Sequence, residues 1–259
     1  MIDLHAHVLC AIDDGPADLV GSIAMVEVAA AEGVRTIVAT PHVRHDFPRS
    51  VPSLIVARVE ELQAALDRYE VPVRVLPGGE VAIGSALELP DDELRAVTLG
   101  GNGTMLLLET PHGPLPPRFE ELVDAVADRG VVVVLAHPEL NPDLQVDHDR
   151  LGDLVARGAL VQLTARSLRE PRRSRARSLA ARALERGWAH ALATDAHSAE
   201  WRSPRLASQL QDARRAHPRF ADGLAWLVTA GPAAILRGER PGPPPERAER
   251  LRRRLLRGR

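Results

Sequence analysis

Apolar runs alternate with amphipathic stretches along most of this chain. The apolar runs, rich in Val, Ile, Leu and Ala, occupy residues 1–7, 35–40, 71–76, 104–110, 131–136, 159–163 and 189–194. The amphipathic stretches occupy residues 19–32, 53–69, 119–129, 151–157 and 175–186. Short, almost continuous apolar runs predict strands buried in a parallel sheet, and the stretches between them predict helices that cover its outer face. Seven such strands favour a closed or nearly closed α/β barrel.

Glycines follow four of the predicted helices, at Gly33, Gly130, Gly158 and Gly187. Glycine is the usual residue just after a helix end because it adopts the left-handed backbone conformation at little cost. These glycines therefore support the predicted helix boundaries. No Gly-x-Gly-x-x-Gly turn opens a helix after any of the apolar runs, which argues against an open dinucleotide-binding sheet.

Residues that bind metal ions well stand at the ends of six of the seven predicted strands. The first run carries His5 and His7, which point to the same face of a strand because they are two residues apart. In a barrel of parallel strands the carboxyl ends share one rim, where catalytic groups gather. Only the run at 159–163, which ends near Gln162 and Thr164, has no such residue. The nine candidate ligands are His5, His7, Asp14, His42, Glu80, Glu109, His137, Asp195 and His197.

The residue types in this set indicate which ions they bind. Imidazole and carboxylate groups suit manganese, iron and zinc alike, and the set has no cysteine, which argues against a structural zinc site. Taken singly, Glu80 or Glu109 would equally well cap a helix or pair with an arginine. Taken together, carboxylates on one rim repel one another unless cations neutralise them, so the set predicts a polynuclear metal centre. Four histidines outside it are assigned no role: His112, His148, His190 and His217.

Length and composition favour an intracellular protein with one main domain. The 259 residues are 45% hydrophobic, enough for a full core, and α/β barrels of this size commonly form one domain; we expect it to span residues 1–240. The net charge of −2 argues against nucleic-acid binding. The single cysteine, Cys10, excludes an internal disulfide and fits a reducing cytoplasm. No apolar stretch is long enough to span a membrane.

The C-terminal segment differs in composition from the rest of the chain. Residues 241–245 read Pro-Gly-Pro-Pro-Pro, which predicts a stiff linker. Residues 246–259 hold seven arginines and two glutamates, a pattern typical of a solvated or frayed terminal helix. As an alternative, these arginines would contact an anionic lipid surface or an acidic partner. Leu251, Leu255 and Leu256 share a rough helical face, so docking on a neighbouring subunit is a further one.

Several of these motifs, in this order, carry a resemblance to a known family. The matching segments are His5-Ala6-His7, Asp13-Asp14-Gly15-Pro16, Ala39-Thr40-Pro41-His42, Gly78-Gly79-Glu80, Ala136-His137-Pro138-Glu139, Asp195-Ala196-His197, Arg202-Ser203-Pro204 and residues 229–236. The chain resembles the PHP-superfamily phosphoesterases, and within them the manganese-dependent tyrosine-protein phosphatases of bacterial capsule and exopolysaccharide operons. The resemblance covers the first 240 residues or so.

The resemblance implies a fold, a metal content and a reaction. The fold is a distorted seven-stranded PHP-type barrel that holds three divalent ions, manganese first, with iron or zinc as alternatives. His5, His7, Glu80 and Asp195 would hold the first ion; Glu80, Glu109 and His137 the second; and Asp14, His42 and His197 the third. A hydroxide that bridges two ions would attack the phosphorus atom, with Asp195, His197 and Arg202 acting in catalysis. The implied partner is a phosphotyrosine protein, such as the tail of a tyrosine kinase.

Two departures from the family pattern concern the substrate. Leu140 follows Glu139 where the family has an arginine that binds phosphate, and leucine has neither its charge nor its donors. The loop at 41–47 also differs. Arg44, Arg166 or Arg202 could compensate, although Arg202 could instead pair with Glu200. Two alternatives therefore stay open: a phosphatase for a small ester such as histidinol phosphate, and a non-catalytic regulator that keeps its metals. A homo-oligomer also stays open.

Overall fold

The protein is built from parallel strands with helices around them. The structure is a computed structural model that describes residues 1–245. The strands are β1 (Ile2–Ala6), β2 (Thr36–Ala39), β3 (His42–Val43), β4 (Arg74–Pro77), β5 (Glu80–Val81), β6 (Met105–Glu109), β7 (Val132–Ala136), β8 (Leu160–Thr164) and β9 (Ala191–Ala193). The α/β class predicted from the alternating pattern is confirmed.

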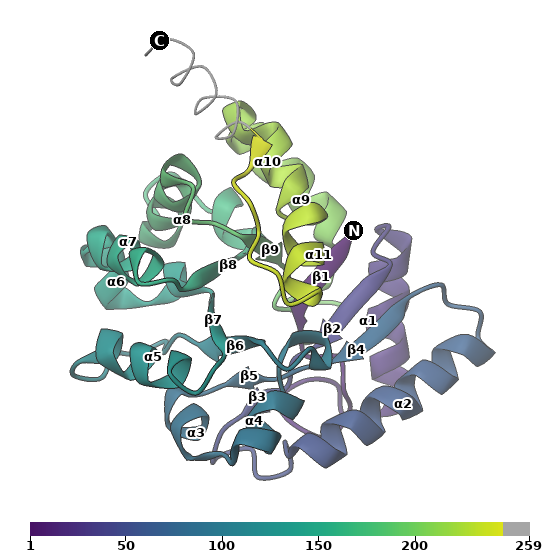
Figure 1. The fold of residues 1–259 in the computed structure, drawn as a ribbon. Helices are drawn as coiled ribbons and strands as arrows, with labels where there is room; N and C mark the ends of the chain where they lie inside the picture. Colours follow the sequence, from purple (N-terminus) through teal and green to yellow (C-terminus); the bar gives the residue numbers. More distant parts are fainter. Residues whose placement is uncertain (246–259) are drawn as a thin grey trace.

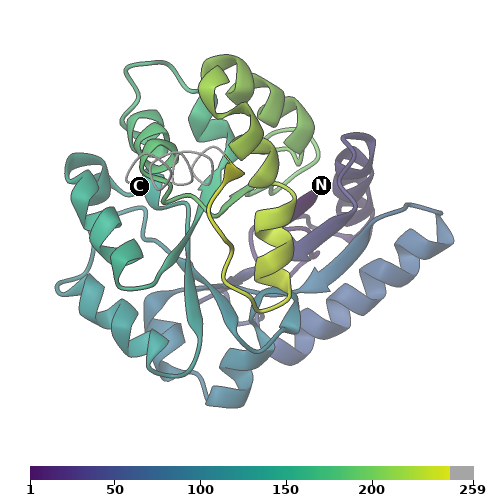
Figure 2. The same ribbon diagram turned by 45° about the horizontal axis from the view of Figure 1, so that its top comes forward.

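The helices surround the strands in both views (Figures 1 and 2). The α-helices are α1 (Leu19–Ala31), α2 (Pro52–Arg68), α3 (Ile83–Glu88), α4 (Asp91–Ala96), α5 (Phe119–Ala127), α6 (Pro142–Val146), α7 (His148–Ala156), α8 (Arg175–Arg186), α9 (Leu206–Ala216), α10 (Ala221–Trp226) and α11 (Ala230–Leu236). Short 3-10 helices are η1 (Leu99–Gly101), η2 (Pro138–Leu140), η3 (Ala165–Arg169) and η4 (Pro218–Phe220).

The strands form two sheets, of order β1-β2-β4 and β3-β5-β6-β7-β8-β9, in which every pair is parallel. The second apolar run forms β2, and the short strand β3 follows it after Thr40 and Pro41; proline has no N–H to offer a sheet. The third run overlaps β4, and the short strand β5 follows after Gly78 and Gly79. A Cβ on Gly78 would lie 2.7 Å from Val38 Cγ1, so the close approach of these two segments requires glycine.

A single closed seven-stranded barrel is therefore not confirmed, since the described residues form nine strands in two sheets. The two outermost strands, β1 and β9, come together only through short contacts. One bridge joins Ala6 to Ala196, and the Asp195 N–H donates to the His5 carbonyl at 2.9 Å. The difference arises because a short strand that was not predicted, β3 or β5, follows the break at Pro41 and the break at the glycine pair.

Two apolar cores lie on the two faces of the strands. The larger core is formed between the strands and the helices. The smaller inner core is Leu4, Val38, Leu99, Met105, Leu107, Val134, Ala136, Leu160, Ala191 and Ile235, the last from α11. Alternate residues of a strand share a face, so Glu109 continues the face of Met105 and Leu107. The inner core therefore gives way to polar side chains at the carboxyl ends of the strands.

Two further predictions concern membrane spans and the C-terminal segment. Within residues 1–245, no helix combines the length and the apolar character that crossing a bilayer requires. The basic segment 246–259 lies outside the described residues, and its proposed helix and contacts stay predictions.

Candidate metal centre

All nine candidate ligands converge at the carboxyl ends of the strands. All are buried except Asp14, whose side chain is 46% exposed. They form four overlapping groups, and in each group the ligand atoms lie within 4.8 Å of one another. The groups are His7, Asp14, His42 and His197; His5, His7 and Glu80; His5, His137 and Asp195; and His42, Glu80 and Glu109.

His5 and His7 direct their rings toward the same two carboxylates. Their Nε2 atoms are 3.2 Å apart, and each lies 3.4 Å from Glu80 Oε2 and 3.7 Å from Asp195 Oδ1. Two imidazole nitrogens approach this closely only when a proton or another cation lies between their lone pairs. The spacing of the two histidines on one strand thus produces the convergence that the sequence predicted.

Glu80 is the central carboxylate of the cluster. Its Oε1 lies 2.6 Å from His137 Nε2, and its Oε2 lies 3.0 Å from His42 Nδ1. The resemblance assigned His137 and Glu109 to one ion together with Glu80. The geometry groups Glu109 with His42 and Glu80, whereas His137 groups with His5 and Asp195. Glu80 remains within reach of both groups.

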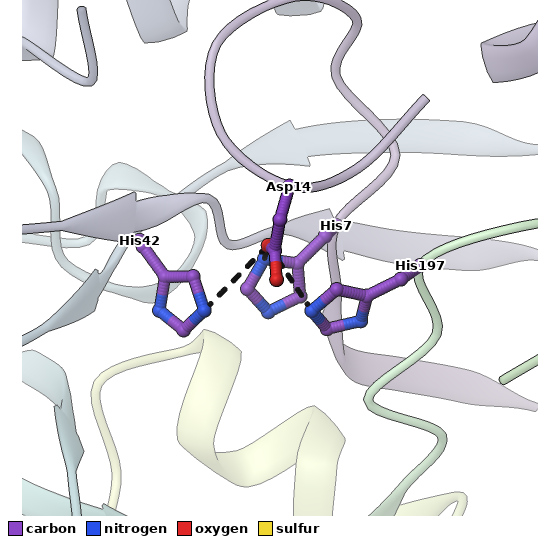
Figure 3. Close-up of side chains that lie close together, drawn as sticks. All are labelled: His7, Asp14, His42 and His197. Carbon is purple, nitrogen blue, oxygen red and sulfur yellow. Dashed lines mark ion pairs between the residues drawn. The ribbon is translucent and has the colours of Figure 1, made fainter. Parts of the chain in front are cut away.

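Figure 3 shows the group that surrounds Asp14. Asp14 Oδ1 lies 3.3 Å from His197 Nε2 and 3.7 Å from His42 Nε2. His7 closes the group, and its ring stacks on that of His197 with centroids 3.8 Å apart. The three residues assigned to the third ion are thus brought together. Asp14 is the exposed member, so it marks the side that solvent reaches.

Residues that the sequence analysis did not single out hold the histidine rings in place. Gln162 Oε1 accepts a hydrogen bond from His5 Nδ1 at 2.9 Å, and Asp13 Oδ2 accepts one from His7 Nδ1 at 2.6 Å. In a neutral ring, each bond leaves the lone pair on Nε2, the atom that faces the carboxylates. The sequence signal for Gln162 was its polar side chain inside an apolar run. The signal for Asp13 was its position next to Asp14.

Two further buried carboxyl groups, of Asp3 and Glu139, hold in place the segments that carry the ligands. Asp3 accepts hydrogen bonds from the Thr194 N–H at 3.0 Å and the Thr194 hydroxyl at 2.5 Å, next to Asp195. Glu139 accepts from the Thr164 N–H at 2.8 Å and the Ser167 hydroxyl at 2.9 Å, two residues after His137. Burial raises the pKa of Asp3 to about 6 despite these hydrogen bonds.

Three non-glycine residues at the centre have left-handed backbone conformations. Their φ angles are 34° at His137, 53° at Asp195 and 46° at Arg202. Such conformations are costly for residues with a Cβ, and they concentrate at functional sites. They turn the chain sharply just beyond β7 and β9, which brings these side chains over the strand ends.

Charges within the cluster shift its titrations strongly. Burial favours neutral rings, but the carboxylates of Asp13 and Glu80 raise the pKa of His7 to about 10. Glu80 likewise raises the pKa of His137 to about 9 against the effect of burial. Burial opposes the charge of Asp195, yet His5, His137 and Arg202 lower its pKa to about 2. In this structure, protons on His7 and His137 therefore offset part of the negative charge of the carboxylates.

Several buried atoms of the cluster have no hydrogen-bond partner among the described residues. They are His42 Nδ1, Glu80 Oε2, His137 Nδ1, Asp195 Oδ2 and His197 Nε2. Buried polar atoms are rarely left in this state in proteins. Nitrogen and carboxylate donors that converge with unused lone pairs suit borderline and hard divalent ions. The residues present therefore fit a metal centre.

The three candidate arginines are placed differently. Arg202 Nη2 donates to Asp195 Oδ1 at 2.7 Å, so its ion pair runs to the cluster and not to Glu200. Arg44 Nη1 donates to Glu109 Oε1 at 2.7 Å. Arg166 instead lines a separate pocket together with Arg169. Two positive groups thus border the centre that has Leu140 in place of an arginine.

His112, to which the sequence assigned no role, lies against the cluster. Its ring stacks on that of His137 with centroids 5.0 Å apart. Burial and the nearby His137 lower the pKa of His112. No signal in the sequence pointed to this contact, because the loop after β6 brings His112 back over a different strand.

Comparisons with known proteins show which family the chain belongs to. The chain is 31% identical to the tyrosine-protein phosphatase YwqE of Bacillus subtilis over 240 residues, 92% of each chain. It is 29% identical to the putative tyrosine-protein phosphatase CapC of Staphylococcus aureus over 88% of each chain. A solved structure described among those of YwqE and Streptococcus pneumoniae CpsB, "unique metal-dependent tyrosine phosphatases", matches with a TM-score of 0.82, 30% identity and coverage of 95% of this chain and 98% of that chain. Since the family model for capsular polysaccharide synthesis proteins CpsB/CapC matches residues 1–226, the chain belongs to that family.

Proposed function

We propose that this protein is a metal-dependent phosphatase that hydrolyses phosphotyrosine on proteins in the control of polysaccharide synthesis. The observation that carries the proposal is the convergence of nine histidines and carboxylates, five of which have a buried side-chain atom without a hydrogen-bond partner among the described residues. Relatives that align over about nine-tenths of their length bear the name tyrosine-protein phosphatase.

We propose the ligand sets that the family resemblance implies, although the distances group Glu109 with His42 and Glu80, and His137 with His5 and Asp195. His5, His7, Glu80 and Asp195 would hold one ion, and Asp14, His42 and His197 another. Glu80 would connect the first ion to one held with Glu109 and His137, because its two oxygens face different histidines. Bound divalent ions would supply Lewis acidity and an activated water nucleophile at neutral pH. We propose three ions, with manganese first and iron or zinc as alternatives.

The residues of this chain would position the phosphoryl group. Arg202 and Arg44 carry guanidinium groups at the border of the cluster, and such groups match phosphoryl oxygens well. They would offset the charge that develops in transfer, in place of the arginine absent at Leu140. Asp195 and His197 lie between Arg202 and Asp14, at the side that solvent reaches. A phenolate with a pKa of about 10 leaves with little help from an acid.

Finer features of the proposal rest on the same relatives and contacts. We propose that the two sheets form a distorted seven-stranded barrel of the PHP type in which β2 with β3, and β4 with β5, each count as one broken strand, since all pairs are parallel and one bridge joins Ala6 to Ala196. We further propose the cytoplasm as the location, because the only cysteine, Cys10, has no partner for an internal disulfide. The proposed partner is a phosphotyrosine protein, with the tail of a tyrosine kinase as the first candidate.

Steady-state kinetics on metal-stripped protein test the proposal. Manganese, iron or zinc is restored in turn, and a phosphotyrosine peptide is compared with histidinol phosphate. We expect metal-dependent turnover with the peptide preferred. His137→Gln should lose both activity and bound metal, whereas His148→Gln on α7 should lose neither.

Two outcomes would replace this proposal with the alternatives. Preference for histidinol phosphate would assign the site to a small ester. Stoichiometric metal binding without turnover on either substrate would assign the protein a regulatory role, with Leu140 as the first residue to revert to arginine.

A further inference from the structure

A second cluster of charged side chains lies outside the metal centre. It lines a surface pocket of about 700 Å³ between η3, the start of α8 and the end of α9. Figure 1 shows α8 and α9 at the same side of the molecule. The lining residues are Arg166, Arg169, Glu170, Arg177, Asp212, Arg215 and Ala216. Four arginines therefore face two carboxylates.

The carboxylates do not neutralise all of these arginines. Asp212 is shared between Arg169, at 3.4 Å, and Arg215, at 3.2 Å. The Glu170 carboxylate accepts a hydrogen bond from the Ser174 hydroxyl. Glu170 forms no ion pair with an arginine among the described residues, and the four arginines outnumber the two carboxylates, so positive charge remains in the pocket.

Arg166 and Arg177 hold the unbalanced charge. Arg177 Nη1 donates to the Glu170 backbone carbonyl at 2.7 Å and forms no ion pair among residues 1–245. The Arg166 side chain, half-buried between the buried residues Ala165 and Ser167, has neither a hydrogen bond nor an ion pair within that range. Guanidinium groups held in this way favour a carboxylate or a phosphoryl group.

The pocket is joined to the metal centre by a short, rigid piece of chain. Gln162 contacts His5, and four residues later Arg166 lies in the pocket, a span of at most about 14 Å. Thr164, between these two residues, and Ser167, just after Arg166, both donate hydrogen bonds to Glu139, which holds η3 against the loop after His137. An extended peptide advances about 3.3 Å per residue. A segment of about six residues would therefore reach both places.

We propose that this arginine pocket is an anion subsite for the protein substrate. It takes a carboxylate or a second phosphoryl group on the polypeptide, within about six residues of the phosphotyrosine. The proposal rests on the proposed phosphatase function for the identity of the substrate. Recognition of a flanking negative charge would make the protein prefer polypeptide substrates, because a small phosphate ester occupies the metal centre without reaching the arginine pocket.

Binding to the metal-free protein tests the pocket apart from catalysis. The probes are fluorescent peptides with an unphosphorylated tyrosine flanked by glutamates, by glutamines or by phosphoserine, and the readout is fluorescence anisotropy. We expect the glutamate or phosphoserine peptide to bind, and the glutamine peptide to bind at least about tenfold more weakly. Whichever anionic peptide binds more tightly identifies the preferred group.

Variants decide whether the pocket itself is responsible. Arg166→Gln should weaken the anionic peptides about five- to tenfold, and Arg166→Gln with Arg177→Gln should weaken them further. Arg173→Gln removes the same charge from a nearby exposed arginine outside the pocket, and its affinity should stay within about twofold. Equal losses in Arg166→Gln and Arg173→Gln, or equal binding of all peptides, would overturn the proposal.

Kinetics with the metal-loaded protein link the pocket to the reaction. The wild-type protein should prefer the phosphotyrosine peptide with glutamates over that with glutamines through KM, and Arg166→Gln should remove that preference. An inactive wild-type protein would count against the phosphatase function alone, since the anisotropy result with metal-free protein still decides the pocket.

Discussion

The inner apolar core and the metal centre are built on the same strands, yet they are held together in opposite ways. β6 places Met105 and Leu107 in the core and Glu109 in the centre. The core gains roughly 25 cal/mol for each Å² of apolar surface removed from water. The centre buries charged groups whose desolvation costs several kcal/mol each unless they are paired. The difference indicates that function, and not stability, maintains the polar layer.

Removing a metal ligand should have the largest effect, and the effect should fall on activity. Asp195→Ala deletes a carboxylate that lies near His5, His7 and Arg202. Hydrolysis of a phosphotyrosine peptide should fall by more than about a hundredfold, the upper end of losses seen when only a supporting partner is removed. Steady-state kinetics with metal analysis measures this loss. Asp149→Ala, an exposed carboxylate on α7, should retain activity; an active Asp195→Ala would contradict the metal-centre assignment.

Truncating a side chain of the inner core should lower the stability of the protein and leave its activity unchanged. Leu99 is fully buried before β6, at the end of the strand remote from Glu109. Leu99→Ala should lower the free energy of unfolding by about 2–5 kcal/mol, measured by urea denaturation. Val20→Ala, 75% exposed, should change it by less than about 0.5 kcal/mol. A loss of activity in the folded fraction of Leu99→Ala would show that the two regions are not separable.

Removing the hydrogen bond that orients a metal ligand, while keeping the ligand, should lower metal affinity to an intermediate degree. Gln162→Leu deletes the acceptor that orients His5 through Nδ1. Metal affinity should fall about ten- to a hundredfold, as measured by calorimetric titration. Gln211→Leu, on the exposed face of α9, serves as the matched substitution and should bind metal normally. Unchanged affinity in Gln162→Leu would mean that the strand alone orients the ring.

The smallest effect should appear in the pH dependence of the metal-free protein. Glu80 raises the pKa of His137 to about 9 against burial, above the value of 6.5 for an unfolded chain. The stability that this pair contributes is complete below pH 6.5 and is lost as the pH rises through about 9. Urea denaturation between pH 6 and pH 10 should show the decline, and His137→Gln should reduce it. A rise in stability over that range would contradict the pairing.

The apolar pattern predicted the longer elements better than the shortest ones, and it missed the two-residue strands β3 and β5. The predicted bounds of α8 are those observed, at 175–186, and those of β7 differ by one residue. Short helices such as α3, α6 and α10 were not predicted, because five or six residues carry too little periodicity to be recognised. The breaks at Pro41 and Gly78 were visible in the sequence, but their effect on sheet pairing depends on contacts with neighbouring strands.

The sequence by itself determined the alternation of strands and helices, and it placed metal-binding side chains at strand ends, because both follow from local spacing along the chain. Only the tertiary structure decided which ligands share a site. Grouping Glu109 with His42, bringing Gln162 to His5, and placing Arg166 in a pocket separate from Arg202 depend on residues distant in sequence. Such contacts arise from how the strands pack and twist around one core, and local pattern carries no record of those distances.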